Sequence, residues 1–172
     1  PQAVVMAPTR ELAQQITEDL RDLAHFYPDI RIVCVYGGAN MAKQVEQLKK
    51  GPQIVVATPG RLQDHMNRRS IDISHVKDIV LDEADEMLNM GFYKDVRKIL
   101  DSIKSKQRLA MFSATISREV MDIGWLYQRD AEEITVQPVL ESAPKIDQYM
   151  MLTTGRNKLA DLTELIIKEG YS

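Results

Sequence analysis

Short apolar runs alternate along this chain with longer segments in which apolar residues recur every three or four positions. Each run stops at a Gly, a Pro or a polar turn, and segments of helical periodicity follow most of these turns. The runs predicted to be buried strands are 3–7, 31–36, 53–57, 77–81 and 108–112. Strands that alternate with helices of this length imply right-handed crossovers between parallel strands. The pattern therefore predicts an α/β fold: a mostly parallel, twisted sheet with helices on both faces.

Capping residues mark where the predicted helices begin. Asn40 can cap a helix that reaches about Lys49, and Ser117 can cap one that reaches about Tyr127. Thr58 can cap a helix with Pro59 at its first position, and another helix is expected to open at Thr9-Arg10-Glu11. A further helix is predicted from about Phe92 to Ile103 by its apolar stripe.

The pattern changes near Gln137. Residues 133–136 are predicted to form a sixth strand, and Pro138 and Pro144 bracket a polar segment typical of a linker. Residues 146–152 are predicted to form another strand and residues 158–168 an amphipathic helix, a pair that cannot make a core alone. The predicted organisation is a first domain over 1–136, a linker over 137–145 and the first strand and helix of a second domain over 146–172.

The composition is that of a globular chain. It also bears on four function classes: nucleic-acid binders with a basic surface, disulfide-rich proteins, His-based metal proteins and membrane proteins. The 172 residues are 44% hydrophobic and 27% charged, with a formal net charge of −3, so no global basic footprint for nucleic acid exists. A single cysteine, Cys34, excludes a disulfide framework, and three scattered histidines disfavour a His-based metal site. No run approaches the ~18 apolar residues of a membrane span. A cytoplasmic protein without membrane partners is expected.

A carboxylate cluster, Asp82-Glu83-Ala84-Asp85, follows the predicted strand 77–81 directly. The carboxyl ends of strands in an open α/β sheet face the ligand crevice, so Asp82 and Glu83 are expected at its rim. Mg²⁺ binds one or two carboxylates together with phosphate oxygens and water, and a second carboxylate can orient a water for attack. A simpler interpretation also fits these residues: Asp82 caps a short helix and the other acids favour its first turn.

Four other predicted strands end in turns with polar or Gly-rich sequences. Each turn alone has an ordinary explanation as helix start, turn chemistry or surface ion pair, but their joint occurrence around a carboxylate cluster indicates a site. These turns are 8–13, 37–38, 58–61 and 113–115.

In order and spacing, these segments resemble the motifs of the DEAD-box ATP-dependent RNA helicases. Residues 8–13 (Pro-Thr-Arg-Glu-Leu-Ala) are similar to motif Ia, Gly37-Gly38 to the GG motif and residues 58–61 (Thr-Pro-Gly-Arg) to motif Ib. Residues 82–85 resemble motif II and residues 113–115 (Ser-Ala-Thr) motif III. The resemblance covers the whole chain and implies a first RecA-like domain of the P-loop NTPase class, followed by the passage into a second RecA-like domain that acts in cis.

The resemblance also implies a role for each site residue. Asp82 would hold Mg²⁺ through water, Glu83 would orient the hydrolytic water, and Asp85 would link to the partner domain and to motif III. Ser113 and Thr115 would tie the nucleotide site to the RNA site through hydrogen bonds to the motif II acids. ATP and Mg²⁺ would be the cofactors. Single-stranded or short duplex RNA would be gripped without regard to sequence and locally unwound, through sugar and phosphate contacts. The implied RNA-contacting residues are Pro8, Thr9, Arg10, Gly37, Gly38, Thr58, Pro59, Gly60 and Arg61.

One departure from the family pattern limits what the chain alone is expected to do. Phosphate binding in this class needs a Gly-rich loop that ends in Gly-Lys-Ser/Thr, and none of the eight glycines here precedes a lysine. The adenine-reading Q motif and the second-domain motifs are missing too. We therefore expect a piece that begins just after the P-loop strand and helix, lacks that strand and cannot hydrolyse ATP alone.

Two alternatives remain open at this point. The first is a non-catalytic RNA-binding module derived from a helicase domain. The second is a Mg²⁺-dependent phosphohydrolase or nuclease that uses Asp82 and Glu83, although it lacks the further carboxylates of a two-metal site.

Overall fold

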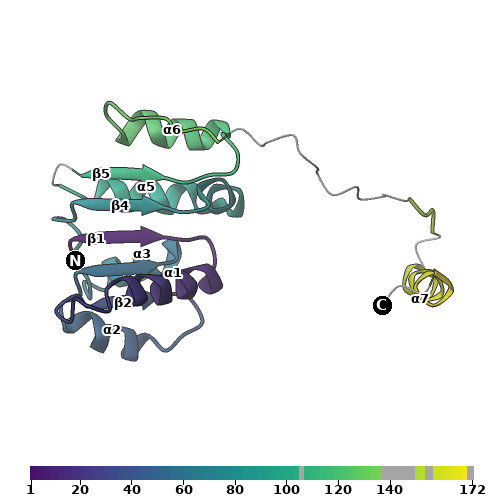
Figure 1. Ribbon diagram of the computed structural model, residues 1–172, viewed down its shortest axis with the longest axis horizontal. Helices are drawn as coiled ribbons and strands as arrows, with labels where there is room; N and C mark the ends of the chain where they lie inside the picture. The colour runs from purple at the N-terminus through teal and green to yellow at the C-terminus, as the bar shows by residue number, and fades with distance from the viewer. Residues whose placement is uncertain (105–106, 137–149, 154–156, 170–172) are drawn as a thin grey trace. The chain divides into compact units, whose positions relative to one another are not determined.

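The computed structural model of the chain describes residues 1–104, 107–136, 150–153 and 157–169. These residues fall into two compact units, Pro1–Glu132 and Glu133–Ser172. The first unit contains a five-stranded sheet in the order β2-β3-β1-β4-β5, and every neighbouring pair of strands is parallel (Figure 1). The prediction of a mostly parallel α/β sheet is confirmed.

Strands and helices follow one another in the predicted order. The strands are β1 (Ala3–Met6), β2 (Ile32–Val35), β3 (Ile54–Ala57), β4 (Asp78–Leu81) and β5 (Arg108–Met111). The helices of the same unit are α1 (Arg10–Leu23), α2 (Met41–Lys49), α3 (Pro59–Asn67), α4 (Ala84–Met87), the wide turn η1 (Leu88–Phe92), α5 (Tyr93–Asp101) and α6 (Arg118–Tyr127).

The predicted helix starts are confirmed by their capping bonds, with one difference. The side chains of Thr9, Asn40 and Ser117 each accept a backbone N–H from the first turn of their helix. Thr58 occupies the capping position of α3, but its side chain makes no capping hydrogen bond. Pro59, fixed at the first helical position, starts this helix by its backbone geometry.

The strands end in register. Met6 of β1 pairs with Ala57 of β3 and with Leu81 of β4, and the same row continues outward to Val35 of β2 and Met111 of β5. Because all five strands are parallel, the turns that follow them begin at one edge of the sheet. At about 4.8 Å between neighbouring strands, this edge is about 19 Å long.

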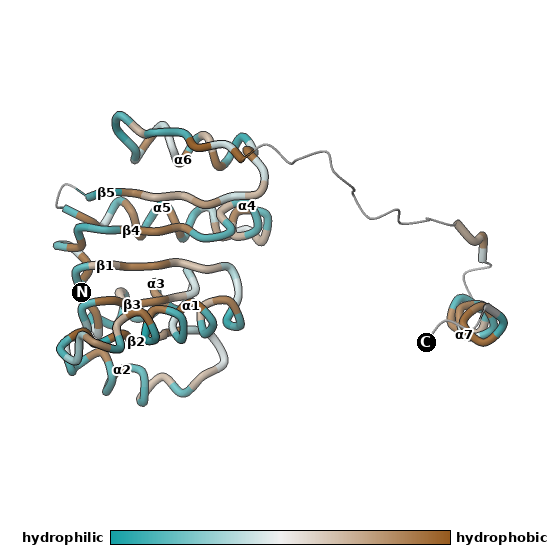
Figure 2. The backbone as a smooth tube through the Cα atoms, viewed as in Figure 1, coloured by the Kyte–Doolittle hydropathy of each residue, from teal (hydrophilic) through white to brown (hydrophobic). Residues whose placement is uncertain are grey.

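Each face of the sheet has its own hydrophobic core. Val4 and Met6 point to the face covered by α2, α3, α5 and α6, whose inner residues include Leu62 and Ile99. Val5 points to the opposite face, which α1 covers with Ala13 and Ile16. The helices alternate hydrophilic and hydrophobic segments along their length, as expected when one side packs on the sheet (Figure 2). Helices therefore cover both faces, as predicted.

The predicted sixth strand at 133–136 is wrong. These residues form no strand, and Ile134 and Val136 are 81% and 87% exposed. Their alternation of apolar and polar residues is typical of a strand, but a strand forms only where a neighbour supplies its hydrogen bonds. Among the described residues, β5 ends the sheet and no strand pairs with its outer edge.

The second unit is described only in part. Met150, Met151 and Leu152 belong to no strand, and the rest of the strand predicted at 146–152 lies outside the described residues, as do 137–145 of the predicted linker. The amphipathic helix is confirmed as α7 (Lys158–Glu169). None of the helices described has the length and apolar character needed to cross a membrane.

Candidate functional site

The turns singled out in the sequence all lie along the carboxyl edge of the sheet. Along the edge from β2 to β5, the turns are Gly37-Gly38 after β2, Thr58–Arg61 after β3, Pro8–Arg10 after β1, Asp82–Asp85 after β4 and Ser113–Thr115 after β5. The acids and the Ser-Ala-Thr turn thus occupy two neighbouring strands, β4 and β5. The other three turns occupy the three strands on the other side. We call these two parts the acid half and the basic half of the edge.

Asp82 and Glu83 begin the acid half. Asp82 is half-buried, and its backbone N–H donates to the carbonyl of Met6 at the end of β1 at 3.0 Å. Its Oδ1 accepts the backbone N–H of Glu83 at 3.0 Å. The other carboxylate oxygen of Asp82 has no hydrogen bond among those found in the described residues, so this group is available to a ligand.

Glu83 is exposed and has a left-handed backbone, with φ 46° and ψ 52°. This conformation costs a residue with a Cβ roughly 1–3 kcal/mol and tends to persist at functional sites. Ala84 holds the turn on one side, because its N–H donates to the carbonyl of Phe112 at 2.9 Å. The turn after β4 is therefore fastened to the end of β5 while the Glu83 side chain stays in solvent.

Asp85 is buried, 4% exposed, and bonds to the turn after β5. Its Oδ2 accepts the hydroxyl of Thr115 at 2.7 Å and the backbone N–H of Thr115 at 2.9 Å. Its own N–H donates to the Ser113 hydroxyl oxygen at 3.2 Å, and that hydroxyl donates to the Thr115 carbonyl at 2.7 Å. We call Asp85, Ser113 and Thr115 the Asp85 cluster. The Thr115 hydroxyl, followed by the Ser113 contact and backbone N–H groups, lowers the pKa of Asp85 despite its burial, so the cluster contains a carboxylate.

The basic half begins with the turn after β1. Pro8 is buried, Thr9 is half-buried, and its hydroxyl caps α1 by accepting the N–H of Leu12 at 3.2 Å. Arg10 is exposed and pairs with the adjacent carboxylate of Glu11. The hydrogen bond and charge of Glu11 raise the pKa of Arg10 and keep its guanidinium charged.

Gly37 and Gly38 are exposed, and Gly38 has φ 84°. A Cβ added at either position would meet no atom of the protein within 4 Å. Gly38 is therefore required by its left-handed backbone, whereas nothing within the chain itself excludes a side chain at Gly37. The space above Gly37 is open to a ligand.

In the turn after β3, Arg61 lies differently from the exposed position expected of a phosphate contact. Pro59 is buried and Gly60 is half-buried, while Thr58 donates its N–H to the Val35 carbonyl at 3.1 Å. The Arg61 side chain is only 11% exposed, and its Nη1 donates to the carbonyl of Ala39 at 3.1 Å. Arg61 therefore points toward the turn after β2.

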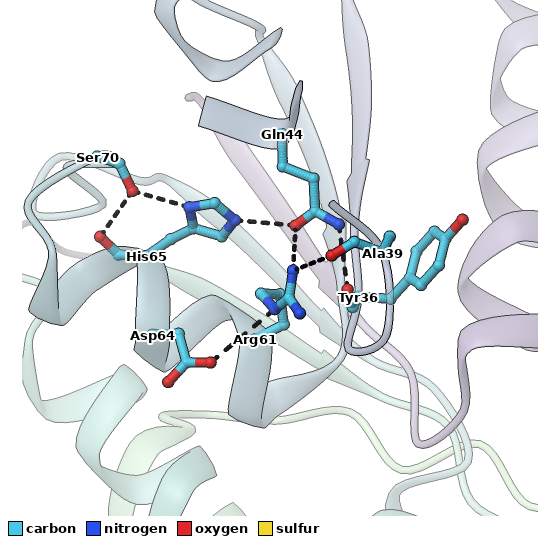
Figure 3. Close-up of polar contacts among 7 residues, drawn as sticks. All are labelled: Tyr36, Ala39, Gln44, Arg61, Asp64, His65 and Ser70. Atoms are coloured by element: carbon cyan, nitrogen blue, oxygen red, sulfur yellow. Dashed lines mark hydrogen bonds and ion pairs between the residues drawn. The ribbon is translucent and has the colours of Figure 1, made fainter. Parts of the chain in front are cut away.

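Two polar residues behind the basic half were not predicted as site residues. Gln44 is 4% exposed and His65 is fully buried, and both side chains make hydrogen bonds that are drawn in Figure 3. A polar residue in an amphipathic helix is ordinarily expected on the solvent side. The signal that could have found them is position: Gln44 lies four residues before the buried Leu48, and His65 three residues after the buried Leu62.

Carboxylates are the candidate metal ligands at this edge. Among the residues that the structure describes, no group of three or more His, Cys, Asp or Glu side chains could hold a metal ion. Asp82 can contribute one carboxylate to a hydrated Mg²⁺ whose other ligands are water and phosphate. A two-metal hydrolytic site, which needs several carboxylates, does not fit this part of the chain.

Comparisons with known proteins give the same family as the motifs. The family description "DEAD/DEAH box helicase" matches residues 1–123. The ATP-dependent RNA helicase CshA of Listeria monocytogenes is 41% identical over 165 residues, which are 96% of this chain and 32% of that protein. The ATP-dependent RNA helicase DeaD of Escherichia coli is 39% identical over 171 residues, 99% of this chain and 27% of that protein.

Solved structures agree. The crystal structure of a DEAD box protein from Methanococcus jannaschii matches with a TM-score of 0.75 and 37% identity, over 96% of this chain and 44% of that one. A hypothetical ATP-dependent RNA helicase from Sulfolobus tokodaii matches with a TM-score of 0.72 and 36% identity. The chain thus spans about a third or less of the length of the two curated relatives described above. The family match over most of the chain and the shared fold show that this chain belongs to the DEAD/DEAH box helicase family.

Proposed function

We propose that this chain is part of an ATP-dependent RNA helicase. It forms the edge that binds RNA and the part of the ATPase site that holds the metal ion and orients the attacking water. The observation that carries this proposal is the division of one sheet edge into an acid half and a basic half. The names of the relatives, which are ATP-dependent RNA helicases, support the same assignment.

The basic half suits the sugar-phosphate backbone of RNA. Helices α1 and α3 begin at this edge, so their unpaired N–H groups and positive dipole ends are directed at a ligand there. Arg10 adds an exposed guanidinium, and the open space above Gly37 admits another backbone. Contacts of this kind grip phosphate and ribose and do not read bases. RNA is therefore the proposed partner, bound without sequence preference.

The acid half suits the reacting end of a nucleotide. In the proposed assignment Asp82 would hold a hydrated Mg²⁺, which would supply charge neutralisation for the phosphates. Glu83, exposed next to it, orients the attacking water. Asp85, Ser113 and Thr115 fix the position of both by fastening the turn after β4 to the turn after β5.

The residues of this chain fit the metal and water part of that site but not the phosphate cradle. Its 172 residues contain no Gly-Lys pair, so no hydrolytic step is assigned to this chain alone. We propose that hydrolysis and unwinding belong to a protein that also supplies the cradle and a second RecA-like domain in cis. On its own, the chain would act as an RNA-binding module.

The test measures binding of the 172-residue chain to fluorescein-labelled ten-nucleotide RNA by anisotropy. Oligouridylate and oligoadenylate should bind equally within about twofold, and binding should weaken as salt rises. Gly37→Leu should weaken binding at least fivefold with an unchanged melting temperature, because its side chain would fill space that the protein leaves empty. Ala42→Leu, an exposed position of the next helix, is the matched control.

Two outcomes would contradict the proposal. One is equal RNA affinity of the wild type and the Gly37→Leu variant. The other is RNA-stimulated phosphate release from ATP by the purified chain, which would show that it holds the nucleotide without a Gly-Lys loop.

A further inference from the structure

Gln44 is a buried amide with three hydrogen bonds to three other residues (Figure 3). Its Nε2 donates to the carbonyl of Tyr36 at 3.1 Å. Its Oε1 accepts from Arg61 Nη1 at 3.1 Å and lies 2.9 Å from His65 Nε2. A glutamine amide offers two donors and two acceptor positions, so both acceptor positions and one donor are in use.

The side chains of Gln44 and Arg61 bind backbone carbonyls on either side of the two glycines. Gln44 binds the carbonyl of Tyr36, just before Gly37, and Arg61 binds the carbonyl of Ala39, just after Gly38. Two consecutive glycines have the largest backbone freedom of any residue pair, and holding each in one conformation costs roughly 1–2 kcal/mol. The side chains of α2 and α3 therefore fix both ends of a segment that would otherwise be free to move.

His65 holds Gln44 from behind. The imidazole is fully buried, with Nδ1 2.8 Å from the Ser70 hydroxyl and Nε2 2.9 Å from Gln44 Oε1. Because the amide oxygen of Gln44 can only accept, Nε2 carries a hydrogen. The Ser70 hydroxyl donates to the His65 carbonyl at 3.0 Å and also lies within reach of Nδ1, so its one hydrogen is shared between these two acceptors of the neutral imidazole residue. Burial, with the nearby guanidinium of Arg61, lowers the pKa of His65 and favours this neutral tautomer.

A last bond extends the connection to α1, the helix that follows β1. The Tyr36 hydroxyl accepts from Gln14 Nε2 of α1 at 2.8 Å. The helix that follows β1, the turn that follows β2 and the helix that follows β3 are thereby joined through side chains. We call Tyr36, Gln44, Arg61 and His65 the Gln44 cluster.

We propose that Gln44 and His65 are positioning residues that hold the Gly37-Gly38 turn in the conformation that accepts RNA backbone. This inference rests on the proposed function, since it assigns the turn to RNA. Neither side chain reaches the exposed edge, so both act through Tyr36, Arg61 and the turn itself. Arg61 accordingly serves to anchor the turn from below through the Ala39 carbonyl, while its Nε lies 3.9 Å from Asp64 Oδ2 of the same helix (Figure 3).

A buried polar cluster of this kind is not needed for stability alone. Apolar residues of similar size can replace a buried polar group with little loss or even a gain in stability, provided that all its partners are replaced too. What the polar cluster adds is direction: its bonds to the carbonyls of Tyr36 and Ala39 each fix one atom beside the two glycines. The expected consequence of its loss is a mobile turn and weaker RNA binding in a chain that remains folded.

The first test needs no RNA. The {¹H}-¹⁵N nuclear Overhauser effect of the Gly37 and Gly38 amides is measured in the wild-type chain, in Gln44→Leu and in the control Gln47→Leu, an exposed glutamine of the same helix. Values in the wild type and the control should equal those of α1. In Gln44→Leu they should fall to values of a mobile loop, while the amides of α1 are unchanged.

The second test adds the labelled ten-nucleotide oligouridylate. Gln44→Leu should bind about tenfold more weakly, which is ~1.4 kcal/mol, and Gln47→Leu should bind as the wild type does within twofold. His65→Phe should behave like Gln44→Leu, and His65→Gln should restore both readouts because its amide keeps an N–H near the position of Nε2. Should Gln44→Leu fail to fold, this second pair carries the test.

The outcomes separate the two proposals. Unchanged Gly37 and Gly38 relaxation in Gln44→Leu and His65→Phe would overturn the positioning role, as would an equal effect of Gln47→Leu. Absence of RNA binding by the wild-type chain would refute the proposed function, while the relaxation measurement would still decide whether the cluster holds the turn.

Discussion

The two halves of the edge are each fastened by a buried hydrogen-bonded cluster, but the clusters are built from opposite chemistry. The Asp85 cluster surrounds a carboxylate with hydroxyl and backbone donors of one neighbouring turn. The Gln44 cluster surrounds a neutral amide with a guanidinium and an imidazole of α3 and the backbone carbonyl of Tyr36. We relate this difference to the proposed ligands. A carboxylate suits the half that would meet a metal ion, whereas the neutral Gln44 amide places no negative charge beneath the half that would meet phosphate.

The largest expected effect is on the Asp85 cluster. Asp85→Ala should lower the free energy of unfolding by about 3 kcal/mol, because it removes two bonds to a charged acceptor and leaves Thr115 without its partner. Urea denaturation followed by circular dichroism measures this. The matched control is Glu86→Ala, an exposed neighbour, which should change the stability by less than about 0.5 kcal/mol. Equal effects of both substitutions would refute the structural role of Asp85.

The Gln44 cluster should be somewhat less sensitive. Gln44→Leu leaves the Tyr36 carbonyl and two donors of the cluster unpaired but fills the same volume, so a loss of about 2 kcal/mol is expected. The same urea experiment applies, with Gln47→Leu as its control. A loss below that of Gln47→Leu would mean that Gln44 is a replaceable packing residue.

Acid should destabilise the two halves in different pH ranges. The pKa of His65 lies below its ordinary value of 6.5, so the unfolded chain takes up the proton first. Its contribution to stability is therefore complete above about pH 6.5 and falls as pH is lowered toward the pKa of the folded state. The His65→Gln variant should lack this loss. Melting temperatures measured from pH 8 to pH 5 would show it, and parallel curves for both proteins would contradict it.

Asp85 should respond at lower pH. Its pKa lies below the ordinary value of 3.8, so the stability from its bonds is complete above about pH 4 and is lost as pH falls through the pKa of the folded state. The gap in melting temperature between wild type and Asp85→Asn should be constant from pH 7 to pH 5 and shrink below pH 4. A gap that shrinks near pH 6 would point to a different group.

The smallest expected effect is the coupling between the clusters. Strand β3 precedes the helix that carries Arg61 and His65, and strand β4 precedes the turn that carries Asp85. These two strands are separated by β1 and lie about 10 Å apart. The effects of Asp85→Ala and Gln44→Leu should therefore add within about 0.5 kcal/mol in the double variant, measured by urea denaturation. A larger coupling energy would show that the two halves are one cooperative network.

Much of this fold was predictable because each local signal agreed with the overall arrangement. Apolar runs gave the five strands, and the capping residues Thr9, Asn40 and Ser117 gave three helix starts to within one residue. The shared edge followed from parallel strands alone. The strand predicted at 133–136 failed because its local pattern was right but a pairing partner is a property of the whole sheet.

The strand ends that carry the candidate site residues were predictable, but the orientation of the side chains was not. Arg61 was expected to face RNA, yet its guanidinium turns inward to the Ala39 carbonyl. Gln44 and His65 were missed because 21 residues separate them in the sequence and polar side chains in helices ordinarily face water. These groups meet because α2 and α3 lie on the same face of the folded sheet.

RNA binding at the carboxyl edge of the sheet is measured most directly by the amide spectrum of the ¹⁵N-labelled chain during titration with oligouridylate. Its glycines report on both edges of the sheet: Gly37, Gly38 and Gly60 follow the carboxyl ends of strands, and Gly51 precedes β3 at the amino edge. The resonances of the first three are expected to shift as RNA is added, while that of Gly51 stays in place. A shift of Gly51 with the other three unchanged would contradict this expectation.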